Sequence, residues 1–96
     1  MHPIELRDQL VDLARAAGLE VREIRGSGAG LADLQASSGT CRVGGKVWVL
    51  LAASDSLNER IDVLGRALAV HAREFLESRY LPPAVRERLG ADFDRA

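Results

Sequence analysis

The side chains that are able to do chemistry are few, and they lie far apart in the sequence. The two histidines are His2, near the N-terminus, and His71, while the single cysteine is Cys41. A zinc site needs three or four such ligands at close spacing, and a nucleophilic thiol needs an adjacent base. Glu74 and Glu77 have the spacing of solvated charges on one helix face. We therefore expect no catalytic centre, no metal and no cofactor.

The remaining candidates fit structural roles. Cys41 lies in a predicted strand, with no helix N-terminus nearby in the sequence to activate its thiol, so we expect a small buried hydrophobe. His71 falls on the apolar face of a predicted helix, and we expect it at the core edge, hydrogen-bonded to a carboxylate or a backbone carbonyl. The glycine-rich residues 26–30 lack the further residues of a phosphate-binding loop, which favours a plain connection.

Composition bounds the class of protein. The 96 residues suffice for one domain with a single core, so residues 1–96 are predicted to form one domain. Six basic and six acidic side chains lie in residues 1–53, and seven and eight lie in residues 54–96, which leaves no basic patch. No apolar run approaches the roughly 18–20 residues of a membrane span, and no signal-peptide pattern is present. We expect a cytoplasmic protein that binds neither nucleic acid nor membranes.

The most strongly patterned segment is residues 54–80. Its apolar positions recur at alternating intervals of four and three, which places them on one face of an amphipathic α-helix. Ser56 and Glu59 have the spacing of a capping box, and Pro82 and Pro83 predict the end of the helix. The predicted apolar face consists of Leu57, Ile61, Leu64, Leu68, His71 and Phe75.

Further elements are predicted on both sides of this helix. A proline at the start and a glycine at the end indicate a helix over residues 3–17 and a short helix over residues 83–90. Residues 91–96 are predicted to be a frayed tail. Residues 19–25 predict an edge strand. Residues 31–36 fit either a short strand or an irregular segment.

Residues 40–51 predict a β-hairpin around the two-residue turn Gly44-Gly45. The predicted cross-strand pairs are Val43 with Lys46, Arg42 with Val47, Cys41 with Trp48, and Thr40 with Val49. One face then carries Cys41, Val43, Trp48 and Leu50, and the other carries Thr40, Arg42, Val47, Val49 and Leu51. The Trp48 face is the more uniformly apolar, so we expect the helices to cover it.

Together these elements predict an α+β fold. We expect a small two-layer domain with an N-terminal helix, a three-stranded, mainly antiparallel sheet containing the Gly-Gly hairpin, a long amphipathic helix and a short C-terminal helix. The run from Val47 to Leu51 is apolar without interruption, which is typical of strands covered on both faces. If the helices cover the Trp48 face, a second copy of the chain would cover the other face. The predicted interface is Arg42, Val47, Val49 and Leu51, and the alternative is a three-layer monomer in which the first helix crosses to that face.

The glycine-turn hairpin leads through a short loop to Glu59-Arg60 at the start of the long helix. Over residues 38–72 this order resembles the N-terminal half of the zincin-like ImmA/IrrE family of zinc metallopeptidases. In that family a His-Glu-x-x-His motif follows on the same helix. Here the motif falls on Ala67-Leu68-Ala69-Val70-His71, so the second histidine alone remains. Because alanine cannot ligate zinc and leucine cannot act as a general base, the resemblance implies a relative without peptidase activity.

Two functional hypotheses follow. The first is a non-catalytic domain that acts through protein–protein contact, most simply as a homodimer, with an unidentified protein as the other partner class. The alternative is a reduced zincin-like relative that keeps residual metal or peptide binding at His71. Stabilisation of the fold by added zinc would favour the second hypothesis.

Overall fold

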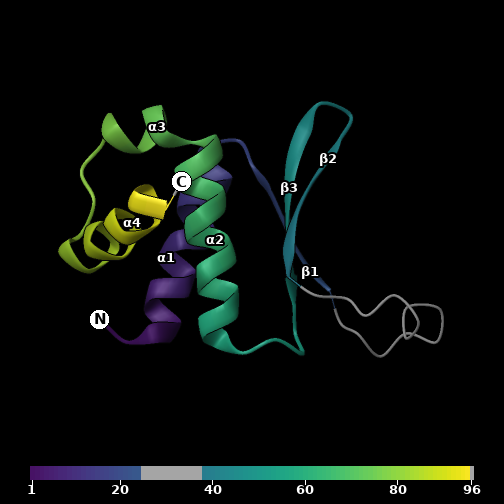
Figure 1. Ribbon diagram of the computed structural model, residues 1–96, viewed down its shortest axis with the longest axis horizontal. Coiled ribbons are helices and arrows are strands. Elements are labelled where there is room, and N and C mark those ends of the chain that lie inside the picture. The colour runs from purple at the N-terminus through teal and green to yellow at the C-terminus, as the bar shows by residue number, and fades with distance from the viewer. Residues whose placement is uncertain (25–37, 96) are drawn as a thin grey trace.

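The computed structural model describes the backbone of residues 1–24 and 38–95, and the side chains as far as residue 91. The described helices are α1 (Pro3–Ala16), α2 (Leu57–His71), α3 (Arg73–Glu77) and α4 (Pro83–Arg95), and the strands are β1 (Glu20–Ile24), β2 (Gly39–Val43) and β3 (Lys46–Ala52). The predicted α+β class is confirmed (Figure 1). The predictions for residues 26–30 and 31–36 lie outside the described residues. Within the described residues, no helix has the length and apolar character needed to cross a membrane.

The three strands form one sheet in the order β1-β3-β2. The hairpin of β2 and β3 has all four of the predicted cross-strand pairs, and both turn glycines adopt positive φ angles of 58° and 81°. Positive φ angles at both central residues are typical of a two-residue hairpin turn, and glycine adopts them readily. β1 lies parallel to β3 on the other side, so the sheet is mixed rather than mainly antiparallel.

The helices lie on one side of the sheet (Figure 1). α2 occupies the centre of the domain, because it packs against β3, α1 and α4. Three leucines, Leu10 of α1, Leu64 of α2 and Leu89 of α4, are each fully buried in this core. The sheet contributes Val21, Val49 and Leu51 to the same core.

The predicted long helix over residues 54–80 is divided in two at Ala72. The start is as predicted, since the Ser56 side chain accepts a hydrogen bond from the backbone N–H of Glu59 at 3.1 Å. At Ala72 the backbone leaves the helical region, with φ −135° and ψ 24°, and α3 begins at the next residue. As a result Leu76 is buried, whereas Phe75 on the predicted apolar face is only partly covered.

The C-terminal helix is longer than predicted. α4 continues through Gly90 to Arg95, where the sequence predicts a helix end and a frayed tail. A glycine inside a helix costs only about 1 kcal/mol relative to alanine, and the fully buried Val85 and Leu89 anchor the helix against α2. Arg88 also forms an ion pair with Asp62 of α2.

Candidate functional site

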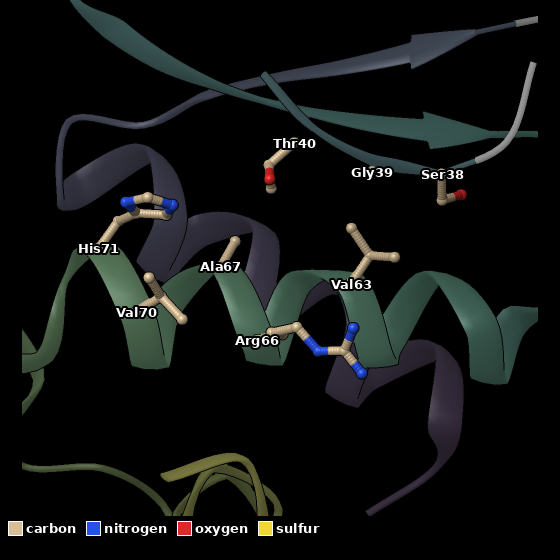
Figure 2. Close-up of a pocket in the computed structure, with 8 residues that line it drawn as sticks. All are labelled: Ser38, Gly39, Thr40, Val63, Arg66, Ala67, Val70 and His71. Carbon is tan, nitrogen blue, oxygen red and sulfur yellow. The ribbon is translucent and has the colours of Figure 1, made fainter. Parts of the chain in front are cut away.

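A groove separates the edge strand β2 from α2 (Figure 2). Its cavity volume is about 240 Å³. Figure 2 shows Thr40 extending from the strand toward the helix, while His71 extends from the helix toward the strand. The lining residues are Ser38, Gly39, Thr40, Val63, Arg66, Ala67, Val70 and His71.

The helix side of the groove has an apolar floor and a polar rim. Val63, Ala67 and Val70 recur at intervals of four and three, so they share one face of α2. The small Ala67 side chain leaves room between strand and helix, whereas the Val70 side chain is 55% exposed at the rim. Arg66 and His71 supply the polar groups of this side.

The strand side of the groove offers unpaired backbone groups. In a hairpin with a two-residue turn, the pair flanking the turn exchanges both hydrogen bonds, and every second pair along the ladder does the same. Val43 and Lys46 flank this turn, so the backbone groups of Thr40 and Arg42 point away from β3. Among the described residues, no segment pairs with this outer edge of β2.

Among the described residues, the charged side chains that line the groove are basic. A second cavity of about 230 Å³ continues along β2 past Thr40 and His71, and Arg42 contributes to its lining. Arg42 and Arg66 are exposed, as is His71. No carboxylate side chain of the described residues lines either cavity, although the Asp55 carboxylate lies 2.7 Å from the backbone nitrogen of the lining residue Ser38. The described side chains that line the two cavities are therefore positively charged or neutral, although the whole chain has a formal charge of −1.

A second candidate surface is the face of the sheet that points away from the helices. We call it the open face; its residues are Glu20, Arg22, Cys41, Val43, Lys46, Trp48 and Leu50, which the strand registers place side by side. The guanidinium of Arg22 lies over the Trp48 ring, 5.1 Å from its centroid. Glu20 forms ion pairs with Arg22 at 2.8 Å and with Lys46 at 3.5 Å. Apolar groups at the centre are thus flanked by charges of both signs.

The prediction of which sheet face the helices cover is wrong. Val49 and Leu51 of the predicted interface are 0% and 2% exposed beneath the helices, and Val47 is partly buried there. The reason is the parallel pairing of β1, which sets Val21 opposite Val49 and places Glu20 opposite Trp48. The alternation of Leu19 and Val21 with Glu20 and Arg22 is the sequence signal for this choice of face. Arg42, the fourth residue of the predicted interface, lines the groove instead.

Two single-residue predictions are also corrected. Cys41 is an exposed free thiol on β2, because the open face on which it lies has no helix over it. His71 is exposed at the C-terminal end of α2 rather than placed at the core edge, because the helix ends there. Among the described residues, no group of three histidine, cysteine, aspartate or glutamate side chains is placed to hold a metal ion.

Comparison with known proteins finds no protein-family model, no curated protein and no solved structure that matches this chain. At the positions of the metallopeptidase motif, Ala67 and Leu68 are buried and His71 is exposed. The resemblance to the ImmA/IrrE family therefore stays a prediction.

Proposed function

We propose that the chain is a non-catalytic domain that acts through protein–protein contact, and that a second copy of the chain binds to its open face. The observation that supports this proposal is the placement of Trp48 and Leu50, on a sheet face that no described helix covers. The uninterrupted apolar run of β3 is typical of a strand with both faces covered. In the described part of the chain, helices cover one of the two faces.

The charge pattern favours a second copy as the occupant. The open face has an apolar centre and carries both signs of charge, with Glu20 between Arg22 and Lys46. A two-fold axis through such a face brings apolar groups onto apolar groups and allows each carboxylate to approach the cations of the other copy. Electrostatic complementarity of this kind fixes orientation and suppresses other partners.

The chain contains a matched pair of residues for testing the proposal. Val43, on the open face, and Ile4, on α1, have the same exposed fraction of 47%. In the dimer a Val43→Glu substitution would bury an unpaired charge, whereas Ile4→Glu would leave its charge in water. We expect Val43→Glu to be a folded monomer and Ile4→Glu to remain dimeric in sedimentation velocity experiments.

Trp48 provides an independent readout, since it is the only tryptophan of the chain. Its fluorescence emission should shift to shorter wavelength with rising protein concentration in the wild type and in Ile4→Glu, but not in Val43→Glu. A wild type that stays monomeric at every concentration would contradict the proposal. So would a Val43→Glu variant that associates as strongly as the wild type.

A further inference from the structure

The groove between β2 and α2 lies on the helix side of the sheet, away from the open face. We propose that this groove is a docking site for an extended, acidic segment of a partner protein, which adds to the sheet as a strand beside β2. Addition of a strand to an exposed sheet edge is a general mode of peptide recognition, in which the backbone supplies affinity and pockets for alternate side chains supply specificity.

The backbone requirement is met by two residues of β2. Thr40 and Arg42 each direct one N–H and one C=O away from β3, as the hairpin register dictates. The described part of the chain places no strand against this edge. A partner strand is therefore able to form backbone hydrogen bonds with both residues without breaking any bond of the sheet.

The shape of the groove suits the side chains of such a strand. Every second side chain of the added strand would face α2, above the floor formed by Val63 and Ala67. A small-molecule site commonly has a volume of about 300–1,000 Å³. The two cavities, at about 240 and 230 Å³, are each smaller than this and lie one after the other along β2. This arrangement fits the successive groove-facing side chains of a peptide strand, which are every second residue, better than it fits one enclosed ligand.

The charges select the chemistry of the segment. Arg66 lines one cavity, Arg42 lines the other and His71 lines both, and in the described part of the chain no carboxylate side chain lines either. Guanidinium groups bind carboxylates through strong, charge-assisted hydrogen bonds. A lysine at the same position of the segment would meet like charge. We therefore infer that glutamate or aspartate side chains of the segment face the groove.

The test uses two synthetic peptides and the complete chain. The first is a blocked eight-residue peptide, Thr-Glu-Thr-Val-Thr-Glu-Thr-Val, in which glutamate and valine share one face of the strand. The second has lysine in place of both glutamates. We expect the acidic peptide to shift the amide NMR signals of Thr40, Arg42 and Val63, and the lysine peptide to leave them unchanged.

Variants separate the backbone contribution from the charge contribution. Thr40→Pro removes one outward N–H but no hydrogen bond to β3, and proline is tolerated at such edge positions. Thr40→Val loses the same hydroxyl but keeps that N–H, so Thr40→Pro is compared with Thr40→Val. Arg66→Glu reverses the groove charge, and Arg86→Glu makes the same change at an exposed position of α4. We expect Thr40→Pro to bind the acidic peptide about tenfold more weakly than Thr40→Val, the effect of one good hydrogen bond. We expect Arg66→Glu to bind it about tenfold more weakly than the wild type, and Arg86→Glu to bind like the wild type.

Several outcomes would overturn the proposal. One is equal binding of the acidic and lysine peptides by the wild type, and another is no binding of either peptide at millimolar concentration. Undiminished binding of the acidic peptide by Thr40→Pro would exclude strand addition. Undiminished binding by Arg66→Glu would exclude the charge recognition. Signal changes confined to the open face would place the peptide outside the groove.

Discussion

The carboxylate of Asp55 accepts a hydrogen bond from the backbone N–H of Ser38, with 2.7 Å between Oδ2 and the nitrogen. Ser38 directly precedes β2, and Asp55 lies in the loop between β3 and α2. The hydroxyl of Ser38 in turn accepts a hydrogen bond from the N–H of Ala52 at 2.9 Å. Ser38 thus joins the start of β2 to the end of β3 and to the loop that leads into α2. This contact fixes the end of the groove at which Ser38 lies.

The Asp55 contact predicts a pH dependence of stability. The backbone N–H of Ser38, and to a lesser extent its side chain, lower the pKa of Asp55 below its ordinary value of 3.8. Because the pKa is lower in the folded state, the stabilisation is complete above pH 3.8 and is lost as the pH falls through the folded-state pKa. We expect the wild type to be more stable than Asp55→Asn at neutral pH, in urea unfolding experiments. The difference should shrink in strong acid, and a difference that stays constant over the whole range would contradict the assignment.

Substitutions in α2 test the position of the core. Leu64 and Leu68 are both fully buried. We expect Leu64→Ala and Leu68→Ala each to lower the free energy of unfolding by about 2–5 kcal/mol, through lost burial and the cavity that remains. Val70 on the same helix is 55% exposed, so Val70→Ala is the control, with an expected change within about 0.5 kcal/mol. A cost below about 0.5 kcal/mol at either leucine would mean that α2 turns a different face toward the core.

Neighbouring residues of β3 should respond oppositely to the same change. Val49 is fully buried beneath the helices, whereas Leu50 belongs to the open face. A glutamate at Val49 would place an unpaired charge in the core, so we expect Val49→Glu to abolish cooperative thermal unfolding. We expect Leu50→Glu to fold and to melt cooperatively. A folded Val49→Glu protein would contradict this assignment and would mean that Val49 faces outward.

Zinc distinguishes the metallopeptidase resemblance from the proposed function. A metal ion that binds only the folded state must raise the melting temperature. Within the described part of the chain, His71 lacks companion ligands. We therefore expect stoichiometric zinc to leave the melting temperatures of the wild type and of His71→Ala unchanged. A zinc-dependent rise in the wild type that His71→Ala removes would support residual metal binding.

The sequence by itself determined the features that depend on neighbouring residues. The Ser56 and Glu59 pair predicts the start of α2, because a capping hydrogen bond spans three residues. Gly44 and Gly45 predict the hairpin register, because a two-residue turn with positive φ angles leaves one alignment of the flanking strands. Both are local interactions whose geometry is set by the backbone, so residue type and spacing suffice to predict them.

Tertiary structure alone decided which face of β3 is buried and where the long helix ends. Both faces of β3 are apolar, so its own pattern does not distinguish them, and the choice follows from the pairing of Val21 with Val49 across 28 positions of sequence. The end of α2 at Ala72 lacks a glycine or proline signal and accompanies burial of Leu76. The groove depends on the buried face of β3 and on the end of α2. It forms where β2 extends beside α2, Ala67 leaves space between them, and His71 lies at the end of the helix. Packing between distant segments selects these features. The alternation in β1 indicates which face of β1 is buried, but its pairing with β3 decides which face of β3 is buried with it.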